Sequence, residues 1–152
     1  MYKLYRQIKL KVSKEQCWDF FSAPENLKVI TPDYMGFDII EGGGKEMYEG
    51  QIIAYTVSPL FNFKVKWVTE ITHVRQGEFF VDEQRFGPYK FWHHKHFFEE
   101  IAGGVLCTDE IHYMPPFKVI APLLNKLTIE SKLKEIFDYR EKVLVERFGR
   151  VD

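Results

Sequence analysis

Residues 89–114 decide the fold, and they read YKFWHHKHFFEEIAGGVLCTDEIHYM. Segments 89–101 and 104–114 have the residue types and length of two long β-strands. Between them, Gly103-Gly104 is typical of a tight turn. Because two strands joined by so short a connection must run antiparallel, this stretch predicts a hairpin within an antiparallel sheet.

Further strands precede this hairpin. Residues 63–75 alternate clearly, with Lys64 and Lys66 on one face and Trp67 on the other. Gln76-Gly77 is typical of a two-residue hairpin turn. Pro115-Pro116 ends the sheet, since proline cannot continue a central strand. The remaining strands are expected at 3–12, 36–41, 46–57 and 78–86.

Helical signals flank the strands. Ser13 is a typical N-cap and Pro24 a typical first residue of a short helix. After the sheet, apolar residues at helical spacing form two stripes, displaced by roughly 140°. We therefore expect a break near 128–131 and a long helix from about 130 to 147. The stripes consist of Ile120, Leu123, Leu124 and Leu127, and of Leu133, Ile136, Phe137, Leu144 and Phe148.

The order of elements predicts an α+β fold. One strand, two short helices, six strands and a long C-terminal helix follow one another within 152 residues. A single antiparallel sheet has one face to cover, and the last helix can cover it. A strongly curved sheet leaves a cavity beneath that helix. We expect residues 1–152 to form one domain.

Composition excludes several classes of protein. The formal net charge is −1, which gives no support to a nucleic-acid groove or to stable membrane anchoring. Cys17 and Cys107 have no metal-finger spacing and are expected to be single thiols, buried or half-buried, in a reducing compartment. The N-terminal segment lacks the apolar core of a signal peptide, and no apolar run spans a membrane. We expect a cytoplasmic monomer or homodimer.

Motifs that point to a family lie along nearly the whole chain. They are Trp18-x-Phe20-Phe21-x-x-Pro24-x-Asn26-Leu27-x-x-Ile30-Thr31-Pro32, Trp67-x-x-x-Ile71, Asp82-x-Gln84-x-x-Gly87-Pro88, Trp92-x-His94-x-His96-x-Phe98, Asp109-x-x-x-Tyr113 and Ile136-Phe137-x-Tyr139-Arg140. Together they resemble ligand-binding SRPBCC-domain proteins of the START-like, birch-pollen-allergen-like helix-grip superfamily, which also includes polyketide cyclase- and dehydrase-like proteins. The resemblance implies a curved, seven-stranded antiparallel sheet wrapped around a long C-terminal helix, with an internal cavity.

Strand parity indicates which side chains face this cavity. Lys64 and Lys66 belong in water, so Trp67 points inward, and Lys95 places the even residues of its strand inside. Pairing across the turns carries the inner face to the neighbouring strands. The connection at Gly87 must then have an odd number of residues or a bulge. We expect the following residues to bind the ligand: Trp67, Asp82, Gln84, Trp92, His94, His96, Asp109 and Tyr113.

Two carboxylates and two imidazoles cannot be buried unpaired without a large cost. We expect Asp82 to pair with His94, and His96 with Asp109. Such a network can simply hold the strands in register, or it can orient the polar end of a small hydrophobic or aromatic ligand.

Other functions are open at this stage. The same His/Asp set can act as general acid and base in a cyclase/dehydratase-type enzyme, as the resemblance suggests, and a protein that works only through its surface is a third class. His94-x-His96 with Asp82 or Asp109 could form a metal set, but a lone His-x-His is unspecific. We expect no metal and no cofactor, and a small hydrophobic or aromatic molecule as the partner.

Overall fold

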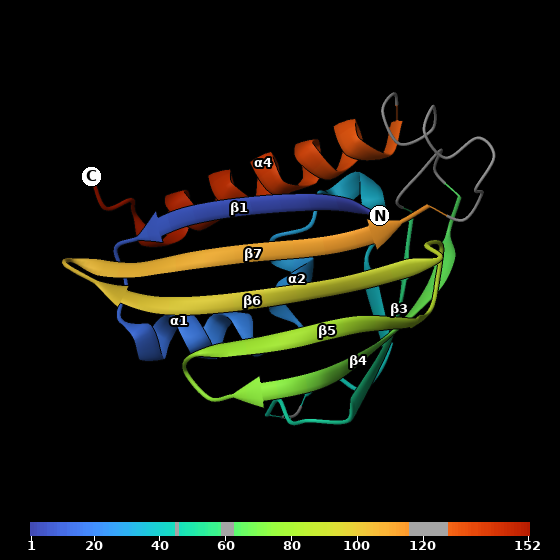
Figure 1. Cartoon of the computed structure of the whole chain (residues 1–152), viewed down its shortest axis with the longest axis horizontal. Coiled ribbons are helices and arrows are strands. Elements are labelled where there is room, and N and C mark those ends of the chain that lie inside the picture. Colours follow the sequence, from blue (N-terminus) through green and yellow to red (C-terminus); the bar gives the residue numbers. More distant parts are fainter. Residues whose placement is uncertain (45, 59–62, 116–127) are drawn as a thin grey trace.

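Seven strands form one antiparallel sheet in the order β1-β7-β6-β5-β4-β3-β2 (Figure 1). This is a computed structural model, and it describes residues 1–44, 46–58, 63–115 and 128–152. The strand number, the antiparallel pairing and the long C-terminal helix are as the sequence predicted. The strands are β1 (Tyr2–Leu10), β2 (Asp38–Glu41), β3 (Gln51–Val57), β4 (Val65–Arg75), β5 (Phe79–Phe86), β6 (Phe91–Ile101) and β7 (Gly104–Met114).

The helices are α1 (Lys14–Phe21), α2 (Asn26–Val29), the single 3-10 turn η1 (Asp33–Met35) and α4 (Glu130–Phe148). As expected, the Ser13 hydroxyl caps α1, accepting from the Gln16 amide at 3.2 Å. Helix α4 runs along β1 (Figure 1), where Arg6 is ion-paired with Asp138. The apolar stripe expected at residues 120–127 lies outside the described residues.

The hairpin between β4 and β5 differs from the prediction. Arg75 pairs with Phe79, so three residues, not two, form the turn. That turn alone would place the wrong side chains on the inner face of β5, because a shift of one residue moves every side chain of a strand to the opposite face. A bulge at Thr72 supplies one extra residue and restores the parity, so that Asp82 lies opposite Ile71.

The next two pairings bring the acidic and imidazole groups together. Strands β5 and β6 pair even residues with even residues, with Asp82 opposite His94. Residues 84–92, an odd number, separate the last pair, Glu83 and His93, as the parity argument required. Strands β6 and β7 are joined by the two-residue turn Ala102-Gly103, and His96 lies opposite Asp109. Three neighbouring strands thus carry these groups on one face.

The inner face of the sheet holds two apolar clusters. One joins β3, β4 and β7 to the first half of α4, through Trp67, Tyr113 and Phe137 among others. The second joins α1 to the far end of α4, through Trp18 and Leu144. Cys17 and Cys107 belong to it as free thiols, with sulfurs 3.4 Å apart. The polar cluster lies where these two apolar regions meet.

No helix among the described residues is long and apolar enough to cross a bilayer.

Docking of α4 on the sheet rests on buried leucine contacts, which a truncation can test. Leu144 is 2% exposed, and Leu144→Ala should lower the free energy of unfolding by about 2–5 kcal/mol. The control Ile40→Ala removes an aliphatic side chain that is 57% exposed and should change it by less than about 0.5 kcal/mol. Urea unfolding measures both. Equal, small effects of the two variants would contradict this packing.

Candidate functional site

A cavity of about 170 Å³ lies between the sheet, the short helices and α4. Its walls are mostly apolar. Side chains from three regions close it: the sheet, the segment from α1 to η1, and α4. The apolar lining comprises Phe20, Phe21, Leu27, Ile30, Met35, Phe37, Met47, Ile53, Val57, Trp67, Ile71, Phe80, Tyr89, Trp92, Leu133, Ile136 and Phe137.

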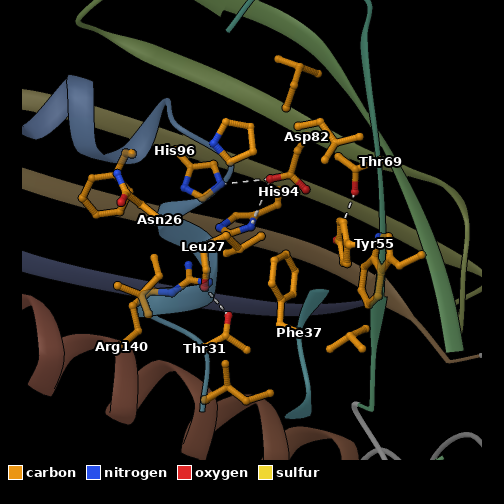
Figure 2. A pocket seen from close by; sticks show the side chains of 18 of the residues that line it. Asn26, Leu27, Thr31, Phe37, Tyr55, Thr69, Asp82, His94, His96 and Arg140 are labelled. Atoms are coloured by element: carbon orange, nitrogen blue, oxygen red, sulfur yellow. Dashed lines mark hydrogen bonds and ion pairs between the residues drawn. The ribbon is translucent and has the colours of Figure 1, made fainter. Parts of the chain in front are cut away.

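The acidic and imidazole side chains of the lining form one cluster, and the part of the cavity beside it is called the polar end below (Figure 2). Three of these groups line the cavity: Asp82 of β5, and His94 and His96 of β6. His96 Nε2 lies 3.0 Å from Asp82 Oδ2, and His94 Nδ1 lies 3.4 Å from the same oxygen. The two imidazole rings pack at a centroid distance of 3.7 Å. One carboxylate oxygen is therefore shared by two rings.

Asp109 lies behind these rings and does not line the cavity. Its Oδ1 atom accepts a hydrogen bond of 2.9 Å from His94 Nε2. His96 Nδ1 is also 2.9 Å from Oδ1, but it is out of line for a hydrogen bond. Each imidazole thus lies between the two carboxylates, with one ring nitrogen toward each.

The prediction of pairing was right in kind and wrong in detail. The four groups do pair with one another, as their burial requires. However, the hydrogen bonds are diagonal: His94 bonds to Asp109, and His96 bonds to Asp82. Residues directly opposite in register make only the longer or misaligned contacts. The side chains lean along the strands, which backbone register alone does not reveal.

The charges of the cluster follow from this pairing. Burial opposes ionisation of Asp82 and Asp109, but the two histidines outweigh it, and the pKa of Asp109 falls well below its usual range. Burial and the nearby His96 lower the pKa of His94. For His96 the two carboxylates outweigh burial and raise the pKa. Two buried carboxylates therefore stay ionised beside a neutral His94.

Arg140 is the cation that the sequence analysis did not place in the site. It projects from α4 toward the cavity (Figure 2) and is buried. Its guanidinium lies 4.5 Å from the centre of the Phe137 ring, and its Nη1 is 4.0 Å from Asp109 Oδ1. That distance is too long for a hydrogen bond, and Nε has no partner among the described residues. The guanidinium is therefore poorly satisfied.

A sequence signal for Arg140 exists. It falls at helical spacing between Phe137 and Leu144, on the apolar stripe that faces the sheet. A charge on the buried face of a helix needs a partner there, and the acidic strand positions supply it.

The structure places the other predicted residues unevenly. Trp67 and Trp92 line the cavity, with ring centroids 5.3 Å apart. Gln84 does not: its amide bonds to both the N–H and the C=O of Tyr89 and closes the β5–β6 connection. Tyr113 does not line the cavity either, because it packs against Tyr2 at a centroid distance of 5.6 Å.

Polar groups from outside the three central strands complete the lining. Tyr55 of β3 and Thr69 of β4 are hydrogen-bonded at 3.2 Å (Figure 2). Asn26 and Thr31 come from the helical segment and bond to backbone carbonyls of Phe20 and Leu27. Strand parity does place Thr69 inward beside Trp67, but sequence reasoning missed Asn26 and Thr31, because nothing local shows that short helices face the same cavity as the strands.

The fold has solved counterparts. Ginseng major latex-like protein 151 from Panax ginseng is 15% identical over 97% of both chains, with a TM-score of 0.69. Protein CV1439 from Chromobacterium violaceum is 13% identical over 99% of this chain and 100% of that one, with a TM-score of 0.71. Ara h 8.0201 is 13% identical over 95% and 98%, with a TM-score of 0.62.

At these identities the likeness establishes the fold alone, and the chain has the helix-grip fold. No family model matches the sequence, and no curated protein matches it either.

The buried charges predict an asymmetry between two neighbouring acidic residues. Asp109→Ala leaves His94, His96 and Arg140 without their common carboxylate and should cost about 3–5 kcal/mol of unfolding free energy. Glu110→Ala, on the opposite face with Lys3 and Lys95, should cost less than about 1 kcal/mol. Urea unfolding of both variants measures the difference. Similar losses would show that the buried cluster is not specially stabilising.

Proposed function

We propose that this protein binds a small aromatic or hydrophobic molecule in its internal cavity. The observation that carries the proposal is a mostly apolar cavity in which the acidic and imidazole groups form one cluster. Pockets for small molecules have this composition, since apolar walls supply affinity and a few polar groups supply orientation. The bulky aromatic residues of the sequence line this space instead of filling it.

The cavity volume limits the size of the ligand. About 170 Å³ is close to the roughly 150 Å³ of an apolar cavity that accepts benzene. A ligand with a single ring and a short substituent fits this space. A fatty acid or a sterol does not, unless the walls move apart.

Arg140 favours a ligand that carries an anionic group. A guanidinium has five N–H donors; in Arg140, Nε has no hydrogen-bond partner among the described residues and Nη1 is 4.0 Å from Asp109 Oδ1. The Asp109 carboxylate, 4.0 Å away, offsets the charge of the guanidinium but is too far to accept a hydrogen bond from it. A carboxylate or phenolate on the ligand would accept from this fork. The ligand class that we propose is therefore a small aromatic acid.

Binding of two small probes tests this proposal. The protein is first treated with a chelator, so that no bound metal ion contributes to the affinities. Benzoate should bind about 10- to 100-fold more tightly than benzyl alcohol, because a hydrogen bond to a buried charge contributes about 1.5–3 kcal/mol. Arg140→Met should remove the preference. Lys142→Met removes a cation from the same helix whose side chain is 72% exposed, and it should keep the preference. Chemical-shift titration by NMR reports both affinities and the fold of each variant.

Two results would contradict the proposal. One is that neither probe shifts the resonances of the cavity residues. The other is that folded Arg140→Met discriminates between benzoate and benzyl alcohol as well as the wild type does, which would place the anion elsewhere.

A second candidate is an acid–base enzyme of the cyclase/dehydratase type. The observation that favours it is His94, a cavity-lining imidazole with a lowered pKa and a hydrogen bond to Asp109. A neutral imidazole held by a carboxylate can accept a proton from a bound substrate. His94→Ala would then abolish turnover while leaving binding of the aromatic acid nearly unchanged, and equal loss of both would count against catalysis.

A further inference from the structure

We propose that Asp82, His94 and His96 bind one divalent transition-metal ion at the polar end of the cavity. Each offers one ligand atom, and the three atoms lie within 4.8 Å of one another. Two imidazoles and a carboxylate on one face are a common set for Zn²⁺ and for Fe²⁺. On the sequence alone the His-x-His spacing was too unspecific for this inference. The β5–β6 register supplies the missing carboxylate.

The spacing of the ligand atoms suits a metal. Bonds of about 2.0–2.2 Å in a tetrahedral site put neighbouring ligand atoms about 3.3–3.6 Å apart. Asp82 Oδ2 lies 3.4 Å from His94 Nδ1 and 3.0 Å from His96 Nε2. The ligand atoms of His94 and His96 lie within 4.8 Å of each other, so the rings need only turn toward a common point for all three residues to bind one ion.

Asp109 lies beside both rings, on the side away from Asp82, and hydrogen-bonds to the His94 ring. The nitrogens that do not face Asp82 are His94 Nε2 and His96 Nδ1, and each lies 2.9 Å from Asp109 Oδ1. Metal-bound histidines nearly always give their second nitrogen to a carboxylate or carbonyl, which fixes the tautomer and the ring. Asp109 occupies that position for both imidazoles at once.

The charge and the access of the site also fit a cation. Two carboxylates, those of Asp82 and Asp109, lie against the imidazoles of His94 and His96 and supply negative charge beside the site. All three proposed ligands line the cavity, whereas Asp109 lies behind them. A metal held by three protein ligands keeps a coordination position open, here toward the space that a small molecule occupies.

Titration of metal-stripped, tag-free protein with Co²⁺ tests the site without any organic ligand. The wild type should bind one equivalent, with the visible absorption of a low-coordinate Co²⁺ centre, and Zn²⁺ should displace it. Asp82→Asn and His96→Gln should each weaken binding at least about 100-fold, through loss of a ligand. Asp109→Asn should weaken it about 10- to 100-fold, the usual effect of an orienting carboxylate.

The matched control is His93→Gln. His93 neighbours His94 in the chain but points to the other face, where it contacts Glu83 at 2.7 Å. This variant should bind Co²⁺ like the wild type. Near-UV circular dichroism identifies the variants that fold.

The proposal fails if wild-type protein binds no Co²⁺ in the visible assay, a result that needs no variant. It also fails if folded Asp82→Asn binds as tightly as the wild type, or if His93→Gln is as damaging as His96→Gln. Benzoate binding is measured without metal, and Co²⁺ binding is measured without benzoate. A protein that binds no Co²⁺ can therefore still bind the aromatic acid, and a protein that binds no benzoate can still bind the metal.

Discussion

A single buried oxygen, Asp109 Oδ1, organises the inner face of this protein. Two imidazole nitrogens lie 2.9 Å from it, and the Arg140 guanidinium approaches to 4.0 Å. An ionised carboxylate in such surroundings is tolerated only because positive or donating groups surround it. The positions of both histidine rings, and through Arg140 the position of α4, are tied to this requirement.

The cavity lies next to that arrangement. Charged groups of β7 and α4 meet beneath the sheet, and they interrupt the apolar packing between the two clusters of the core. Asp82, His94 and His96 present their remaining surface to the space in front of Asp109. One side of this network lines the cavity, and the other side, through Asp109 and Arg140, connects the sheet to α4.

Much of the fold could be predicted from residue patterns, because strand alternation and helical spacing are local. The inner face of β5 was inferred correctly even though the turn before it was not: a three-residue turn and the bulge at Thr72 compensate. The turn is one residue longer than predicted and the bulge adds one unpredicted residue. Together they shift the pairing by two residues, which leaves the same side chains on the inner face.

The site was less accessible to such reasoning. The inward-facing acids and imidazoles were predictable from parity, but their diagonal bonding depends on side-chain rotamers. Gln84 lies on the expected strand, yet its amide serves the backbone of Tyr89. Arg140 could be found only by combining a helical stripe with the charges of distant strands. Contacts between elements far apart in sequence set the chemistry.

The two walls of the cavity differ in how freely they can change. The charged groups come from β5, β6 and β7, each paired on both sides, and from α4. The opposite wall consists largely of apolar side chains such as Leu27, Ile30 and Phe37, which hold no charge in place. Substitutions there can reshape the space while the buried ion pairs stay intact. Evolution can thus exchange one bound molecule for another along the helical wall, independently of the network that keeps the chain folded.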